Sequence, residues 1–283
     1  MLENMSIRVL GGCKTETVNG DGSEIIGLEF DILGKPVIFR IAAGGRARLA
    51  DIVPAARAIS AKFIDIATEQ IYCQRGRIPC HKGCPACCSY LTSLSIPEVF
   101  CFNREVFLKP KHLSSHIMRT YLLAASQIIK HRPPFLLPKQ YSPDESANFS
   151  ELHSLSDWYA NLNLVCPFMY NNQCVIYQQR PLVCREHFVT GSAQGCKGGH
   201  GEAQVVELPV RIANILCQFT GELCAADDAV MIPLALAWYE KNKELDERTW
   251  PAVKMVKLFT ELVKAAAVKN SIVFSCLSYI KFS

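Results

Sequence analysis

Two stretches near the N-terminus alternate apolar with polar residues. In residues 24–32 (EIIGLEFDI), and again in residues 36–42 (PVIFRIA), apolar side chains recur at every second position. This period is typical of a strand with one buried face, because successive side chains of a strand point to opposite sides. We therefore expect an antiparallel hairpin that turns at residues 33–35. Residues 6–10 (SIRVL) are expected to add a third strand, and the glycine pair after the hairpin to end the sheet.

Farther along the chain, apolar residues recur every three or four positions, which is the spacing of one face of a helix. This pattern predicts helices over residues 49–72, 95–107, 114–129, 208–223, 228–245 and 251–268. Residues 132–148 contain four prolines among polar residues and are predicted to be a loop. A short segment at residues 157–164 is expected to lead into the next part of the chain.

The fold class that follows is α+β and mainly helical. We expect a small N-terminal antiparallel β-hairpin or sheet with one helix in residues 1–75. Residues 76–200 would form a cysteine-rich helical domain stapled by metal and interrupted by the proline-rich loop 132–148. Residues 201–283 would form a C-terminal helical region.

Composition narrows the class of protein. The chain has 283 residues, of which 49% are hydrophobic and 20% charged, so it can bury a core. The formal net charge is only +4 and no basic run stands out, so the charge gives no argument for nucleic-acid binding and does not exclude it. No window of about 18 apolar residues is present and the start lacks the pattern of a signal peptide. We therefore expect a cytoplasmic protein that does not bind membranes, with its thiols kept reduced.

Cysteine spacing is the most informative chemical feature. Eight of the 14 cysteines fall in two blocks, CHKGCPACC and a longer stretch that begins at CPF. In a reducing compartment, thiols at short spacings favour metal binding over disulfides. The candidate metal ligands are Cys80, Cys84, Cys87 and Cys88 in the first block, and Cys166, Cys174, Cys184 and Cys196 in the second block.

Local sequence suits these ligand loops. Gly83 and Pro85 supply one permissive and one preset backbone position in the first block. Adjacent side chains diverge, so the vicinal pair Cys87-Cys88 is hard to use on one ion, and one of the two could serve a second metal, bridge or stay free. Asn171-Asn172 predicts the turn of a knuckle or hairpin between Cys166 and Cys174. Three nearby cations either donate to sulfur or serve surface solubility; they are Arg180, Arg185 and Lys197.

Two blocks of four thiolates suit one cluster plus one ion, or two four-coordinate ions. Zinc bound by four thiolates would be structural, whereas an iron–sulfur cluster ([4Fe–4S]) would permit redox chemistry. We favour iron–sulfur slightly for the first block, because three thiols at that spacing suit a cubane and the second block can supply a fourth. Radical S-adenosylmethionine enzymes use the spacing Cys80-x3-Cys84-x2-Cys87, but Ala86 stands where they have an aromatic residue and no barrel pattern follows.

Other cysteines and histidines fit simpler interpretations. The isolated cysteines are expected to pack as small hydrophobes, with Cys73 the one that could join the cluster. These are Cys13, Cys73, Cys101, Cys217, Cys224 and Cys276. The histidines beside the blocks are expected to lie near the metal or at the surface rather than to bind it; they are His81, His187 and His200. Glu98 is predicted to be a carboxylate in the first turn of a helix rather than an acid–base group.

The patterns CxxxCxxCC and CPF…C-x-IY-x-x-RP-x-x-CR resemble the cysteine-cluster family described as a zinc- or iron-chelating domain (the YkgJ family). Besides the cysteines, the matching residues are Pro167, Phe168, Ile176, Tyr177, Arg180, Pro181 and Arg185, and the resemblance covers about residues 78–200. It implies a metal-chelating module. One relative is a flagellin lysine methylase, so the resemblance leaves an enzymatic role open.

Three functions are compatible with these patterns. The leading hypothesis is a metal-binding protein that holds an iron–sulfur cluster or zinc through both cysteine blocks. The alternatives are a metal-dependent enzyme that modifies a protein or peptide, like a methylase, and a structural interaction protein stapled by zinc. The expected partner is an unidentified protein or peptide. Without a nucleotide-binding or methyl-donor motif, the sequence does not decide whether the chain is an enzyme.

Overall fold

The computed structural model describes residues 6–10, 23–32, 35–107, 110–133, 145–197, 202–226 and 229–277. Within these ranges helices predominate, and every strand pair is antiparallel. The mainly helical α+β class expected from the sequence is therefore confirmed. None of the helices in these ranges is both long and apolar enough to cross a bilayer.

The N-terminal strands form one three-stranded sheet. β1 (Ile7–Leu10) and β2 (Glu24–Ile32) both pair with β3 (Lys35–Ala43), so the strand order is β1-β3-β2. Alternate residues such as Leu28 and Ile41 are fully buried, because one face of the sheet packs on helices. The predicted hairpin and third strand are confirmed, while residues 33 and 34 of its turn lie outside the described residues.

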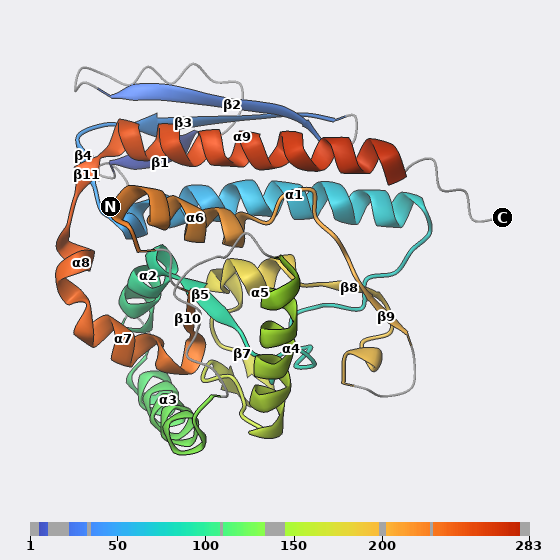
Figure 1. The fold of residues 1–283 in the computed structure, drawn as a ribbon, viewed down its shortest axis with the longest axis vertical. Coiled ribbons are helices and arrows are strands. Elements are labelled where there is room, and N and C mark those ends of the chain that lie inside the picture. The colour runs from blue at the N-terminus through green and yellow to red at the C-terminus, as the bar shows by residue number, and fades with distance from the viewer. Residues whose placement is uncertain are drawn as a thin grey trace.

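Three helices pack together beside the sheet (Figure 1). α1 (Val53–Cys73), which follows a 3₁₀ turn at Leu49–Ile52, and α9 (Ala252–Leu277) contact its strands, and α6 (Ile212–Cys224) packs against both of these helices. Their apolar faces meet the sheet in the largest core cluster, which contains Phe63, Phe219 and Phe259 with no exposed surface. This cluster draws residues from all three predicted segments of the chain. The three-part division of the chain stays a prediction.

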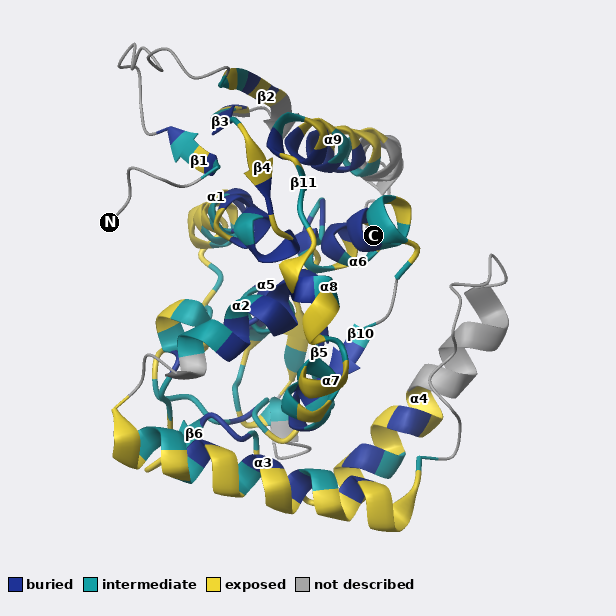
Figure 2. Cartoon of the chain, turned by 90° about the vertical axis from the view of Figure 1, so that its left-hand side faces the viewer, coloured by how far each residue is buried: buried dark blue, intermediate teal, exposed yellow. Residues whose placement is uncertain are grey.

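A second group of helices lies on the side of α1 and α6 away from the sheet (Figure 1). It contains α2 (Ile96–Phe107), α3 (Lys111–His131) and the short α5 (Leu182–Glu186). In Figure 2, α3 runs along the edge of the molecule with many exposed residues. Its opposite face buries Ile117 and Tyr121 in a smaller core cluster around Phe168.

Several short strands pair across long stretches of chain. β5 (Ser93–Ser95) pairs with β10 (Ala229–Met231), and β4 (Arg46–Ala47) pairs with β11 (Trp250–Pro251). Two further antiparallel pairs lie in or next to the second cysteine block. They are β6 (Met169–Tyr170) with β7 (Gln173–Cys174), and β8 (Val189–Gly191) with β9 (Ala203–Val205).

Two sequence predictions about helices are wrong. α4 (Glu145–Asn161) begins inside the predicted loop 132–148 and includes most of the predicted short segment 157–164. The prolines all precede residue 144, so they do not interrupt this helix. Residues 134–144 lie outside the described residues.

The helix predicted over residues 228–245 is also broken. That stretch forms β10, a 3₁₀ turn at Ile232–Leu234, α7 (Ala235–Lys241) and α8 (Lys243–Glu247). Pro233 cannot donate a helical hydrogen bond, and pairing of β10 with β5 holds the preceding residues extended. Tertiary pairing thus overrides the helical pattern there.

Candidate metal centre

The first cysteine block lies in an irregular loop between α1 and β5. The backbone N–H of Cys84 donates to the carbonyl of His81 at 3.1 Å, and that of Cys88 donates to the carbonyl of Pro85 at 3.0 Å. Gly83 between these turns has φ of +98°, in the left-handed region that favours glycine. The permissive role predicted for Gly83 is confirmed.

In the second block, Cys166 and Cys174 flank the β6–β7 hairpin. Its turn is made by Asn171 and Asn172, whose φ angles are +49° and +58°. Positive φ at both central residues is typical of a two-residue hairpin turn, and asparagine tolerates it better than most residues. The predicted hairpin is confirmed, and it brings Cys166 and Cys174 to the same end of the two strands.

The two blocks contact each other at both ends of the first block. The N–H of Cys166 donates to the carbonyl of Cys88 at 2.9 Å. At the other end, the backbone N–H of Val189, in β8, donates to the sulfur of Cys80. The first block is therefore held between the β6–β7 hairpin and the β8–β9 hairpin.

The string IYxxRPxxCR folds into a turn that presents Cys184. Ile176 is buried in the smaller core cluster, and the Arg180 guanidinium stacks 3.9 Å from the centre of the Tyr177 ring. Arg185 Nε donates to the carbonyl of Arg180 at 2.9 Å, which closes the turn. α5 starts directly after this turn and carries Cys184. The Arg185 side chain thus binds a backbone carbonyl, whereas the Arg180 side chain lies close enough to lower the pKa of the Cys87 thiol.

A buried carboxylate fixes the start of α5. Oε1 of Glu98, in the first turn of α2, accepts a hydrogen bond from the Leu182 N–H at 2.7 Å. Its Oε2 accepts from the Ser95 hydroxyl at 3.0 Å. Glu98 is 1% exposed, and this burial raises its pKa. The helix-first-turn position predicted for Glu98 is confirmed, and the structure adds its contact with α5.

A second buried carboxylate fixes the end of α5. Glu186 Oε1 accepts from the Ile212 N–H at 2.9 Å and from the Ser60 hydroxyl at 2.8 Å. These bonds join α5 to the start of α6 and to α1. Burial raises the pKa of Glu186 to about 7. Sequence reasoning missed Glu186, because its partners lie far away along the chain.

The thiols converge on one pocket of about 90 Å³. Cys196 is not among its lining residues; it sits in a 3₁₀ turn, Gly195–Lys197, half-buried beside the pocket. None of the eight thiols forms a disulfide. Seven of the eight predicted ligands line the pocket: Cys80, Cys84, Cys87, Cys88, Cys166, Cys174 and Cys184.

Burial and mutual repulsion dominate the electrostatics of these thiols. Burial raises the pKa of Cys166 to about 12, with further increases from the neighbouring Cys174 and Cys87. Burial also raises the pKa of Cys184 well above its ordinary value. In contrast, interaction between the neighbouring thiols of Cys87 and Cys88 lowers the pKa of Cys87 to about 6 and raises that of Cys88.

As placed, the described residues contain no group of three or more His, Cys, Asp or Glu side chains arranged closely enough to hold a metal ion. His81 Nδ1 lies 2.8 Å from the carbonyl of Pro79, and the His187 ring packs edge-on against Tyr90. His187 lines the thiol pocket, and its pKa is lowered by burial and by Arg211. His200 and the Lys197 side chain lie outside the described residues.

The isolated cysteines occupy other places. Cys73 ends α1 and is exposed, while Cys101 is half-buried, with its thiol 3.6 Å from a Glu105 carboxylate oxygen. Cys217 and Cys224 lie on α6. None of these four lines the thiol pocket. Cys13 and the side chain of Cys276 lie outside the described residues.

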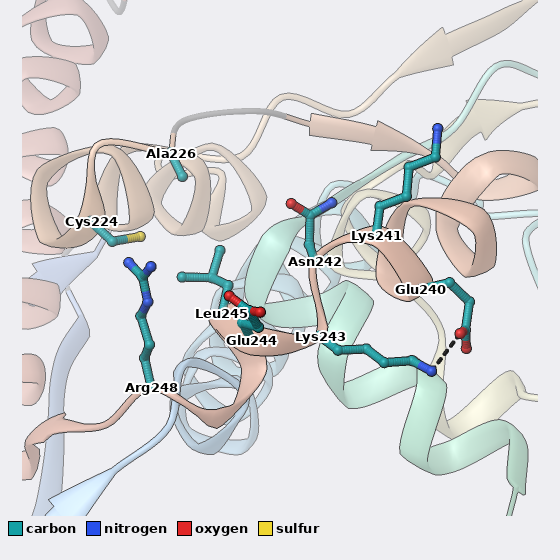
Figure 3. A pocket seen from close by; sticks show the side chains of 9 residues that line it. All are labelled: Cys224, Ala226, Glu240, Lys241, Asn242, Lys243, Glu244, Leu245 and Arg248. Carbon is teal, nitrogen blue, oxygen red and sulfur yellow. Dashed lines mark ion pairs between the residues drawn. The ribbon is translucent and has the colours of Figure 1, made fainter.

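A larger, open pocket of about 450 Å³ lies between the end of α6 and the α7–α8 segment (Figure 3). The Cys224 sulfur and the Arg248 guanidinium lie near each other on one side of it. Lys243 and Glu240 form an exposed ion pair on the other side. Cations and anions alternate around this pocket, so its charge favours no single class of ligand.

Comparison with known proteins gave no match to a family model, to a curated protein or to a solved structure. The resemblance to the chelating family therefore stays a prediction that rests on the cysteine pattern.

Proposed function

We propose that this protein binds a metal centre through the thiolates of its two cysteine blocks. The supporting observation is that seven of the eight predicted ligands, from stretches far apart in the sequence, line one small pocket and form no disulfide. Metal binding would draw sulfurs from around the pocket to about 2.3 Å from an ion and would remove their protons. The proposal requires reduced thiols and so fits the cytoplasmic location expected from the sequence.

The donors and their surroundings suit such a centre. Backbone N–H groups of Val189 and Phe168 donate to the sulfurs of Cys80 and Cys166. Such hydrogen bonds stabilise negative charge on sulfur and tune thiolate metal centres. The cation of Arg180 also lines the pocket. Sulfur ligands select zinc or iron–sulfur clusters, the two alternatives expected from the sequence.

Pocket size bears on the enzyme alternative. Pockets for small organic ligands commonly measure about 300–1,000 Å³, whereas the thiol pocket measures about 90 Å³. The thiol pocket therefore suits an ion or a compact cluster better than an organic substrate. No specific observation favours methyl transfer, and the enzyme interpretation stays a prediction that calorimetry with S-adenosylmethionine would test.

Elemental analysis of anaerobically purified protein tests the proposal. Cys84→Ser should lose metal relative to the wild type, because Cys84 lines the pocket. Cys224→Ser is the matched control, since Cys224 is also a half-buried free cysteine but lies on α6 away from the thiol pocket. Brown protein with broad absorption near about 400 nm would indicate iron–sulfur, and colourless protein with bound zinc would indicate a structural ion.

Equal metal content in Cys84→Ser and Cys224→Ser would contradict the ligand assignment. Wild-type protein that binds neither zinc nor iron would overturn the proposal as a whole. The variant Cys276→Ser provides a second control, because the sequence predicts that Cys276 packs as an isolated apolar residue.

A further inference from the structure

Two apolar stripes run side by side along α3. The members of the first stripe are all buried inside the protein: Ile117, Tyr121, Ala124 and Ile128. The second stripe lies one residue farther along the helix at every position: Met118, Leu122, Ala125 and Ile129. Successive members of either stripe are four, three and four residues apart, so each stripe follows one face of the helix. We call the second stripe the outer seam.

Most of the outer seam is exposed. Leu122 and Ile129 keep 65% and 70% of their surface accessible to solvent, and Met118 keeps 40%. Figure 2 shows α3 along the edge of the molecule, with many exposed residues on its outer side. Scattered exposed apolar residues are common, but a continuous row at this spacing is the pattern by which one helix packs against another. Within the described residues, α3 therefore uses only one of two faces that are suited to packing.

The charge of α3 indicates which kind of partner fits the outer seam. Residues 111–131 contain three Lys or Arg, three His and no Asp or Glu. Arg119 and Lys130 each directly follow a member of the seam, which places them along its side away from the buried stripe, and both are exposed. In paired helices, charges beside the apolar seam decide the choice of partner. A helix with acidic residues would complement these cations, whereas a second copy of α3 would bring like charges together.

We propose that the outer seam of α3 docks an amphipathic helix of another protein. The apolar stripe of that helix would cover the seam, and its acidic residues would face Arg119 and Lys130. This inference goes beyond metal binding and does not depend on it. His116 Nε2 of α3 lies 2.8 Å from the Met169 carbonyl in β6, so the partner would bind close to the β6–β7 hairpin.

A synthetic helical peptide tests the proposal. The probe has about 21 residues, or three heptads, with Leu at the apolar positions and Glu beside them, where like charges keep it from pairing with itself. A matched peptide carries Lys in place of each Glu. Binding of the labelled peptides to the full-length protein is followed by fluorescence anisotropy. Wild type should bind the acidic peptide at least tenfold more tightly than the basic one, and added salt should weaken the acidic complex.

Substitutions locate the binding surface. Leu122→Ser should weaken binding of the acidic peptide at least tenfold, because it removes the largest contact near the middle of the seam. Ile38→Ser is the matched control, since Ile38 is 64% exposed but lies on β3, and it should bind like wild type. Arg119→Glu should weaken the acidic complex and strengthen the basic one. Circular dichroism shows whether each variant folds, and Ile129→Ser replaces Leu122→Ser if the latter does not.

The outcomes distinguish the possible occupants of the seam. The proposal is overturned if wild type does not bind the acidic peptide, binds the basic one as tightly, or loses no affinity in Leu122→Ser. Sedimentation of wild type as a dimer that Leu122→Ser abolishes would assign the seam to a second copy instead. Binding to vesicles of anionic phosphatidylglycerol that Leu122→Ser abolishes would assign it to a membrane surface, and either result would also overturn the proposal. Metal content should be the same in Leu122→Ser and wild type, so these outcomes leave the proposed metal binding unaffected.

Discussion

The part of the molecule built on the sheet and the part built on the cysteines are stabilised by different interactions. In the former, β1–β3 and the long helices α1, α6 and α9 bury a continuous apolar cluster that includes Phe63, Phe219 and Phe259. In the latter, the ligands sit on a loop, two-residue strands and a five-residue helix. Such short elements bury little apolar area, so specific hydrogen bonds and buried carboxylates must position them.

This difference indicates which interactions each part needs in order to fold. Burial of apolar area supplies the main driving force for the sheet and its helices. The cysteine region holds many thiols close together, several of them with pKa values raised by burial. Metal ligation would replace their protons and add folding free energy to that region. We therefore expect changes in the apolar core to lower the stability of the protein without changing its metal content. Changes near the thiols should affect metal binding.

The largest expected effect is that of truncating the apolar core. Phe259→Ala removes a fully buried ring that meets Phe219 edge-on at 6.0 Å. The free energy of unfolding should fall by about 3–5 kcal/mol, as measured by denaturant titration with circular dichroism. Phe259→Leu should lose much less, because it keeps most of the volume. The metal content per folded chain should not change. A decrease would show that the apolar core also affects metal binding in the cysteine part.

A smaller effect is expected at Glu98, which joins α2 to the start of α5 in the cysteine part. Glu98→Gln keeps an oxygen for the Leu182 N–H but weakens the remaining contacts, so unfolding free energy should fall by about 1–3 kcal/mol. Metal affinity should also fall, because α5 carries Cys184. Ser95→Ala is the matched control, since it removes the hydroxyl donor to Glu98 and leaves the contact with Leu182. If Glu98→Gln bound metal with the same affinity as wild type, this result would argue against a role of Glu98 in positioning Cys184.

Wild type and Glu98→Gln also test how the unfolding free energy depends on pH. Burial raises the pKa of Glu98 above 4.5 in the folded state, so the folded protein holds this proton more tightly than the unfolded chain. The resulting stability is fully present below pH 4.5 and is lost as pH rises through the raised pKa. The unfolding free energy of wild type minus that of Glu98→Gln should therefore decrease as pH rises above about 4.5. An increase over that range would contradict the raised pKa.

The smallest effect is expected on the outer surface of the sheet region. Lys257 of α9 and Glu24 of β2 form an ion pair at 2.7 Å, with both side chains about half exposed. Lys257→Ala should change the unfolding free energy by less than about 1 kcal/mol, and added salt should reduce the difference further. Thermal unfolding at low and high salt measures both. A loss as large as that of Phe259→Ala would mean that α9 depends on this contact more than on its apolar face.

Local patterns predicted much of the fold. Alternation over residues 24–32 and 36–42 indicated the β2–β3 hairpin, because the two strands are neighbours in sequence. Asn171-Asn172 indicated the β6–β7 turn for the same reason. In contrast, the pairing of β5 with β10 joins three-residue strands from distant stretches, and no local pattern marks it. The start of α4 was missed because the prolines before it dominated the pattern.

For the candidate site, cysteine spacing predicted which residues gather but not how they are held. Seven of the eight candidates line one pocket, whereas Cys196 lies beside it. The contact of Glu98 with Leu182 spans 84 residues, and that of Glu186 with Ser60 spans 126. Single-sequence patterns carry no information about such contacts.

The contact between Glu98 and Leu182 has a consequence for synthesis on the ribosome. The two residues are separated by 84 positions, and α5 with its cysteine cannot reach the first block until the later residue has emerged. At roughly 5–20 residues per second, the first four thiols would wait on the order of ten seconds for their partners. During that interval a nascent chain would depend on the reducing environment around the ribosome to keep those sulfurs from oxidation.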